Sequence, residues 1–186
     1  MKILEIPKRY ILKIEEGTPF DCMEIREKIP DEDTSAELYT AMVNRLREKG
    51  FFQYEVSNFA KKGFESRHNS RYWKCLDYIG IGPSAHSCYK GARFAVSGDL
   101  QGFINSPIQI TEITDNSPCG FEEYAMLRLR LAEGYDLNDF PQHKDDLLKK
   151  IPPLLKAGYI TYNGEKIALT ESGFLMSNSV IEYLIF

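Results

Sequence analysis

The dipeptide Asn163-Gly164 constrains the fold of this chain more than any other pair of neighbouring residues. It stands between two short runs of strand-forming side chains, Tyr159–Tyr162 and Lys166–Leu169. Asn and Gly both tolerate the positive φ of a tight turn, so the two runs are predicted to pair as antiparallel strands. Any fold proposed for this part of the chain must contain that hairpin.

Helical patterns surround the predicted hairpin. The first helix should stop at Gly134, and Pro152-Pro153 should break or kink the second, because proline removes a helical hydrogen bond. Thr170 is a suitable N-cap for the third. The predicted helices are Phe121–Ala132, Asp145–Ala157 and Glu171–Ile185. Helix, helix, hairpin, helix is the order of a small winged-helix-like domain.

The earlier part of the chain mixes one clear helix with short strands. Asp31–Lys49 is the predicted helix, since Pro30 precedes it, acidic residues crowd its first turn and Gly50 follows it. Phe51–Phe59 alternates apolar and polar residues and is predicted to be a strand. Lys61–Arg71 is expected to be a polar loop.

A second hairpin is predicted around Lys90-Gly91, between Ser84–Tyr89 and Ala92–Ser97. Ser97–Pro118 is rich in turn residues and is expected to form a long excursion leading into a linker. Near the N-terminus, Tyr10–Ile14 is a further strand candidate. The expected fold is therefore α+β, with an antiparallel sheet and hairpin segment in residues 1–113 and a winged-helix-like domain in residues 114–186.

Composition excludes several classes of protein. Hydrophobic residues make up 43% and charged residues 27% of 186 residues, as in soluble globular proteins. The net charge of −4 argues against a nucleic-acid or anionic-membrane partner, and no apolar run has the length of a membrane span. The start of the chain lacks the apolar core of a signal peptide, and the four scattered cysteines suit a reducing compartment. These features predict a cytoplasmic location.

Residues 54–89 carry an unusual mixture of side chains. They include two of the three histidines, the only tryptophan and the close pair Gly80 and Gly82. Aromatic walls with a few polar groups, and backbone exposed by glycine, commonly line a ligand pocket. A tyrosine-rich sheet face with a capped loop explains the same composition. The residues alone leave both interpretations open.

The order of the motifs in this segment carries a resemblance. E-x-S-N-F-A begins at Glu55, S-x-H-N-x-x-Y-W begins at Ser66, and Y-x-G-x-G-x-x-A-H-S begins at Tyr78. Together they resemble the oxygen-independent coproporphyrinogen III oxidase family of radical-SAM proteins, and most of all its heme-chaperone-like branch. Leu12–Phe20 is similar to the segment where the family's catalytic barrel ends, so the resemblance implies that residues 1–113 hold the end of the radical-SAM barrel as well as the antiparallel-sheet segment. Leu127–Leu131 and Leu169–Gly173 are similar to its C-terminal domain, and the resemblance runs from about Ile11 to the end.

The resemblance implies a binding role for residues of this segment. The family's tetrapyrrole and S-adenosylmethionine would meet near these side chains, while no catalytic residue is expected in this chain. The expected cofactor-binding residues are His68, Asn69, Tyr72, Trp73, Gly80, Gly82 and His86. Three arginines, Arg67, Arg71 and Arg93, are weaker candidates for pairing with propionate carboxylates. For His86, a hydrogen-bonded place inside the sheet is the competing interpretation.

The cysteines depart from the family pattern. Its 4Fe–4S cluster needs C-x-x-x-C-x-x-C, whereas Cys22, Cys75, Cys88 and Cys119 are far apart in sequence. Each reads as a small buried apolar residue. The resemblance therefore implies the C-terminal portion of such a protein, with the N-terminal radical-SAM barrel as its partner. No cofactor is expected in this portion alone, and no metal site. A full-length relative would hold the 4Fe–4S cluster, S-adenosylmethionine and, in the chaperone branch, heme.

Three functions remain open at this point. The portion helps to close the pocket of an oxidoreductase that decarboxylates coproporphyrinogen III in porphyrin biosynthesis, or it belongs to a chaperone that binds and transfers heme. In either case this portion alone should be inactive. The third is a nucleic-acid-binding module, suggested by the winged-helix order. Lys144–Lys166 holds five lysines against three acidic residues, which is too small a surplus for a DNA-binding stripe.

Overall fold

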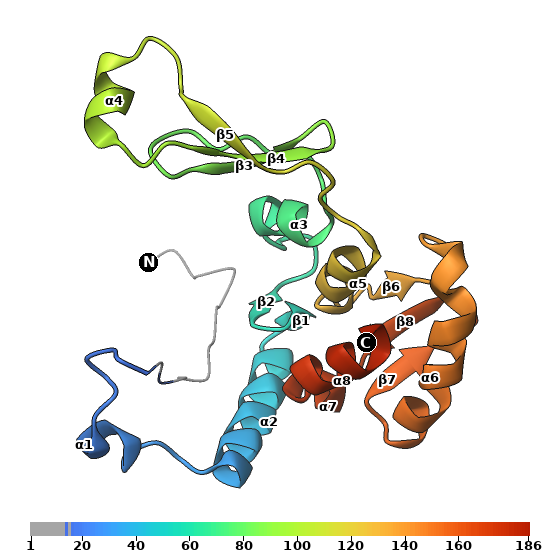
Figure 1. The fold of residues 1–186 in the computed structure, drawn as a ribbon. Helices are drawn as coiled ribbons and strands as arrows, with labels where there is room; N and C mark the ends of the chain where they lie inside the picture. Colours follow the sequence, from blue (N-terminus) through green and yellow to red (C-terminus); the bar gives the residue numbers. More distant parts are fainter. Residues whose placement is uncertain (1–13, 15) are drawn as a thin grey trace.

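The computed structural model describes residue 14 and residues 16–186. It confirms an α+β fold, with helices beside three small antiparallel sheets (Figure 1). Apart from Ile14, the strand predicted at Tyr10–Ile14 lies outside the described residues. Within the described residues, no helix is both long enough and apolar enough to cross a membrane.

The predicted helix at Asp31–Lys49 is confirmed as α2 (Glu32–Glu48), which follows the short α1 (Met23–Arg26). The Asp31 carboxylate accepts a hydrogen bond from the Thr34 amide at 2.8 Å, which satisfies one of the free N–H groups at the helix start. Gly50, at φ +78°, follows the C-terminal end.

Phe51–Phe59 was expected to be one strand, and this expectation is wrong. The segment folds back as the hairpin β1 (Phe52–Glu55) and β2 (Asn58–Ala60), in which Phe52 pairs with Ala60. The Glu55 carboxylate accepts a hydrogen bond from the Ser57 amide at 3.0 Å and therefore closes the turn with a side chain.

The loop expected at Lys61–Arg71 is partly helical. The helix α3 (Arg67–Trp73) begins inside it, because the Ser66 hydroxyl caps it by accepting the Asn69 amide at 3.3 Å. The hairpin around Lys90-Gly91 is confirmed as β3 (His86–Tyr89) and β4 (Ala92–Val96), with His86 opposite Ala95.

Ser97–Pro118 is more ordered than the expected linker. It forms α4 (Leu100–Asn105), capped by Asp99, and β5 (Thr111–Asp115), which pairs with β4. The resulting sheet has the order β3-β4-β5 and lies with α4 at one end of the molecule (Figure 1). We call residues 76–118, which contain this sheet, the sheet module. The domain boundary predicted at residues 113 and 114 falls inside β5 and stays a prediction.

The C-terminal part contains the expected helices and hairpin around a second three-stranded sheet. The order of that sheet is β6-β8-β7, and the hairpin at Asn163-Gly164 is confirmed as β7 and β8. The Asn163 side chain accepts hydrogen bonds from the Glu165 and Lys166 amides at 3.0 and 2.8 Å, which stabilises the turn. The elements are α5 (Phe121–Leu129), β6 (Tyr135–Asp136), η1 (Pro141–His143), α6 (Lys144–Lys156), β7 (Ile160–Tyr162), β8 (Lys166–Leu169), α7 (Glu171–Leu175) and α8 (Ser177–Ile185).

Two details of these helices differ from the prediction. Helix α6 continues through Pro152 and Pro153, which lie on its exposed side, because Leu147, Ile151 and Leu154 hold the opposite side in the core. The closing helix is divided at Met176 into α7 and α8. Thr170 is confirmed as the N-cap, since its hydroxyl accepts the Gly173 amide at 3.0 Å.

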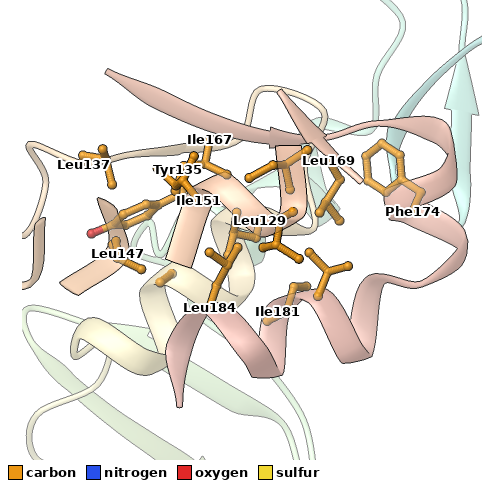
Figure 2. Packing of buried hydrophobic residues seen from close by; sticks show 14 residues of the cluster. Leu129, Tyr135, Leu137, Leu147, Ile151, Ile167, Leu169, Phe174, Ile181 and Leu184 are labelled. Atoms are coloured by element: carbon orange, nitrogen blue, oxygen red, sulfur yellow. The ribbon is translucent and has the colours of Figure 1, made fainter. Parts of the chain in front are cut away.

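The main hydrophobic core lies between the helices and the sheet of this C-terminal part (Figure 2). Leu129 of α5, Ile167 of β8 and Leu184 of α8 are each at most 1% exposed. Tyr135 is fully buried beside them. Residues of α5, α6, α8 and the sheet pack together in this core, so burial of apolar surface stabilises this part of the chain.

Candidate functional site

His68 and Tyr72 lie one turn apart on α3 and form the start of an aromatic stack. The His68 Nε2 atom and the Tyr72 hydroxyl are 2.9 Å apart, and their rings meet edge to face at 5.1 Å. The Tyr72 ring meets the Tyr78 ring in the same manner at 4.5 Å. His68 itself is exposed to solvent. Its contact with Tyr72, which in turn packs on Tyr78, holds the imidazole in position.

Trp73 faces a different neighbour from His68. The Arg130 guanidinium lies 4.8 Å from the centre of its ring, a cation–π geometry. Its Nε1 atom is buried and has no hydrogen-bond partner within the described residues. The Trp73 side chain, at the end of α3, therefore packs against Arg130 at the C-cap of α5. This contact gives Trp73 a structural role, which is the alternative to the predicted role in ligand binding.

Gly80 and Gly82 shape the loop before β3. The Gly80 amide donates to the Ser87 hydroxyl at 3.0 Å, and a Cβ at Gly80 would collide with the His86 carbonyl oxygen. Gly82 adopts φ +114°, and its amide donates to the Gln109 side chain at 3.0 Å. Gly80 is required for close approach within the protein and Gly82 for its positive φ, and both backbone amides are already bound inside the chain.

His86 and Asn69 are the remaining residues of the predicted site. His86 begins β3 and is exposed. Asn69 is half-buried on α3, and its backbone amide donates to the Ser66 hydroxyl that caps the helix. Tyr78 connects the two regions, because its backbone pairs with Cys88 of β3 through hydrogen bonds of 2.7 and 3.0 Å. The structure thus joins α3 to β3 through Tyr78, with His68 and His86 exposed on the two elements.

The other side of α3 borders a surface hollow. Its basic lining residues are Arg67, Arg71 and Lys74, and its acidic ones are Glu65 and Glu133. The Lys74 ammonium pairs with the Glu133 carboxylate at 2.8 Å, and the Arg71 Nε donates to the Asp77 carbonyl at 2.9 Å. The exposed Arg67 is therefore the arginine of this hollow that is best placed to meet an anion from outside.

Arg93 is occupied by protein carboxylates. Its guanidinium lies 2.7 Å from Glu123 and 3.8 Å from Asp115. The hydrogen bond with Glu123 raises the pKa of Arg93 above its ordinary value, and both carboxylates give the side chain a structural role. A propionate would have to compete with two carboxylates already in place, which weakens the expectation for this arginine.

Sequence reasoning missed Glu55 and Arg130. The Glu55 side chain is 1% exposed, and its carboxylate accepts hydrogen bonds from Arg130 at 2.9 Å and from the Asn58 side chain. Glu55 lies inside the quoted E-x-S-N-F-A string, and the spacing of that string was the available signal. Arg130 lies in the quoted segment Leu127–Leu131, but it is far from Glu55 along the chain, so neither segment by itself indicated that the two residues pair.

The fold is that of an α+β protein with a winged-helix-like end, and comparisons with known proteins agree with it. Residues 121–176 match the family model described as the HemN C-terminal domain. The chain is 30% identical over 183 residues to the "Heme chaperone HemW" of Lactococcus lactis, covering 93% of this chain and 48% of the relative. It is 31% identical over 167 residues to the protein of the same name in Bacillus subtilis, covering 83% and 44%.

Two further proteins extend the comparison. A mouse protein named "Radical S-adenosyl methionine domain-containing protein 1, mitochondrial" is 47% identical over 79 residues, covering 41% of this chain and 18% of the relative. The solved structure of coproporphyrinogen III oxidase (HemN) from Escherichia coli aligns with a TM-score of 0.55 at 16% identity, covering 87% of this chain and 44% of that chain. That likeness shows the fold alone.

These matches define the class as proteins that contain a HemN C-terminal domain. The chain belongs to the HemN family, where its similar relatives include the HemW heme chaperones, and the resemblance seen in the sequence is confirmed. The chain spans about half the length of the curated relatives it matches.

Proposed function

We propose that this chain is the C-terminal part of a heme chaperone, in which α3 and the start of β3 help to close a heme site on a radical-SAM barrel. The observation that carries the proposal is the similarity to proteins named heme chaperone over 93% of this chain. The names of these relatives favour heme transfer over decarboxylation of coproporphyrinogen III, the other activity that the sequence resemblance implies.

The chemistry of two side chains supports heme as the cargo. A heme offers iron to an imidazole and two propionates to cations. His86 is an exposed imidazole at the start of β3, and His68 is a second one held against Tyr72. Arg67, the residue before His68 in the sequence, supplies an exposed guanidinium at the start of α3. The proposed site thus combines an iron ligand with a partner for a propionate.

The family's iron–sulfur cluster does not fit the residues of this chain. Its cysteines lack the three-thiolate spacing, and the described residues contain no group of acidic, cysteine or histidine side chains arranged to hold a metal. In the proposed whole protein, the cluster and S-adenosylmethionine belong to the barrel. The part described here supplies the wall that faces the cargo.

A hemin titration of the chain joined to a family radical-SAM barrel tests the proposal. His86→Ala should raise the Kd for hemin at least about tenfold, as loss of a metal-site contact does, with little change in melting temperature. His143→Ala is the matched control, because His143 stacks on Phe121 at 3.7 Å in the C-terminal part. Equal binding by both variants would remove His86 from the site.

A second measurement separates the two family activities. The joined protein, with its cluster reconstituted, is incubated anaerobically with coproporphyrinogen III, S-adenosylmethionine and a reductant, and released CO2 is counted. The proposal expects hemin binding and transfer to an apo-acceptor without CO2 release. Stoichiometric CO2 release would assign the chain to an oxidase instead.

A further inference from the structure

The two exposed histidines of the candidate site differ in what their ring nitrogens contact. The His68 Nε2 atom lies 2.9 Å from the Tyr72 hydroxyl, a hydrogen bond between residues one helical turn apart. The His68 Nδ1 atom makes no hydrogen bond within the described residues. In the His86 side chain, at the start of β3, neither nitrogen is bound to another group of the part of the chain that the structure describes. The two imidazoles therefore offer different atoms to a ligand.

Two neighbouring rings hold Tyr72 in place. The Tyr72 ring meets the His68 ring at 5.1 Å and the Tyr78 ring at 4.5 Å, both edge to face. Tyr78 is in turn fixed to β3, because its backbone exchanges hydrogen bonds of 2.7 and 3.0 Å with Cys88. The Tyr72 hydroxyl is therefore kept where it meets Nε2, and Nδ1 is the nitrogen of His68 that is left for a ligand.

The position of Nδ1 in the imidazole ring makes it a poor ligand for the iron of a heme. Nδ1 is bonded to the ring carbon that carries Cβ, so a flat macrocycle bound at Nδ1 would meet the Cβ of the same residue. It is well suited to donate an N–H hydrogen bond to a single oxygen atom. When the Tyr72 O–H donates to Nε2, the neutral His68 ring carries its proton on Nδ1. The phenol then polarises this N–H group towards an outside acceptor.

The charge of α3 favours a carboxylate as that acceptor. Residues 66–74 contain three basic residues and no acidic residue. The guanidinium of Arg67, the residue before His68, is exposed and forms no ion pair with another described residue. Glu65, just before the helix, accepts the Gly63 amide at 3.2 Å. Hydrogen bonds to an ionised carboxylate are stronger than those between neutral groups, so a carboxylate beside Arg67 is a fitting partner for the His68 N–H.

We propose that His68 is a specificity-determining residue that donates a hydrogen bond from Nδ1–H to a propionate of the tetrapyrrole. Tyr72 is the positioning residue, because its hydroxyl holds the His68 ring in the tautomer that this hydrogen bond requires. Within the proposed function, on which this role rests, His86 meets the iron and His68 meets a propionate.

The tautomer of His68 can be measured in this chain without a ligand. Long-range proton–nitrogen NMR of histidine-labelled protein, at a pH at which the ring is neutral, should find the His68 proton on Nδ1. The chain has three histidines, so His86→Ala and His143→Ala assign the spectrum. Tyr72→Phe should move the His68 proton towards Nε2, whereas the matched control Tyr78→Phe keeps the Tyr72 hydroxyl and should not. A proton on Nε2 of His68 in the wild type would overturn the proposal.

Two porphyrins separate a contact with a propionate from a contact with iron. The Kd is measured for hemin and for protoporphyrin IX, which has the propionates but no iron, with the chain joined to a family radical-SAM barrel. His68→Ala should raise both Kd values at least about tenfold, as the loss of a hydrogen bond to a charged group does. His86→Ala should raise only the Kd for hemin. His68→Asn keeps a side-chain N–H donor and should restore most of the affinity for both porphyrins.

The outcomes separate failure of this role of His68 from failure of the proposed function. If the wild type binds neither porphyrin, the proposed function is wrong and the role of His68 falls with it. If the wild type binds hemin and His68→Ala weakens hemin binding alone, His68 is an iron ligand, and the propionate contact is wrong while the proposed function stands. If His68→Ala weakens neither, His68 lies outside the site and the proposal is overturned. Circular dichroism of each variant confirms that it is folded.

Discussion

Arg130, just beyond the end of α5, donates a hydrogen bond from Nη2 to the Oε1 atom of Glu55 at the end of β1, at 2.9 Å. Backbone hydrogen bonds flank this pair, from Val56 to Arg130 at 3.1 Å and from Ala132 to Tyr54 at 3.0 Å. The same guanidinium lies over the Trp73 ring. One arginine thus connects the β1–β2 hairpin, α3 and the C-terminal part.

Removal of Arg130 should therefore destabilise the chain strongly. Arg130→Ala leaves the Glu55 carboxylate, which is 1% exposed, without its cation, and we expect a loss of about 3 kcal/mol in the free energy of unfolding. Urea unfolding measures it. The matched control is Arg45→Ala, which breaks an exposed pair with Glu48 and should cost less than about 1 kcal/mol. Equal losses for the two variants would contradict this role for Arg130.

Gly134 and Gly158 offer a second matched comparison. Both have positive φ, +73° and +75°, so alanine at either position should cost about 1–2 kcal/mol in backbone strain. At Gly134 a Cβ would also collide with the Ile167 carbonyl of β8, whereas the space around Gly158 is open. We expect Gly134→Ala to cost roughly 1–3 kcal/mol more than Gly158→Ala in thermal or urea unfolding.

Tyr135 should make the chain sensitive to alkaline pH. Burial raises the pKa of its fully buried phenol from 10.0 to about 12, and the hydroxyl has no hydrogen-bond partner within the described residues. The unfolded chain ionises first, so the stabilising contribution is complete below pH 10 and is lost as the pH rises from 10 towards 12.

The variant Tyr135→Phe tests this dependence. At pH 7 its free energy of unfolding should lie within about 1 kcal/mol of the wild type, because the lost hydroxyl was unpaired. Between pH 10 and pH 12 its stability should fall less steeply than that of the wild type. Tyr183→Phe, which alters an exposed ring, is the control. If the free energy of unfolding fell equally steeply with pH in all three proteins, Tyr135 would not be the cause of the alkaline sensitivity.

The winged-helix-like part should not bind DNA. Lys149 pairs with Asp146 at 2.7 Å and Lys166 with Asp136 at 3.9 Å, while Lys144 and Lys150 donate to Asn138 and to the Leu184 carbonyl. Too few free lysines remain to release many counterions. Fluorescence anisotropy with a labelled duplex at physiological salt should find no binding tighter than about 10⁻⁴ M. Tighter binding that weakens steeply with added salt would contradict the prediction.

Local chemistry explains the parts of the fold that could be predicted. The caps Asp31 and Thr170 act on amides three residues away, and the Lys90-Gly91 and Asn163-Gly164 turns depend on the backbone freedom of adjacent residues. The family could be recognised because its motifs keep their order along the chain. The roles proposed for His68 and His86 follow from that resemblance and from their exposure, and they stay predictions.

Contacts between residues distant in sequence determine the features of the fold that could not be predicted. Strand β5 is exposed at nearly every position and has no apolar alternation, so only its pairing with β4 makes it a strand. Helix α6 survives two prolines because its opposite face is buried in the core. The Glu55–Arg130 pair joins two residues that are distant in sequence. Hydrogen bonds and turns between neighbours are determined by local sequence, whereas burial and charge pairing depend on which distant segments the folded chain brings together.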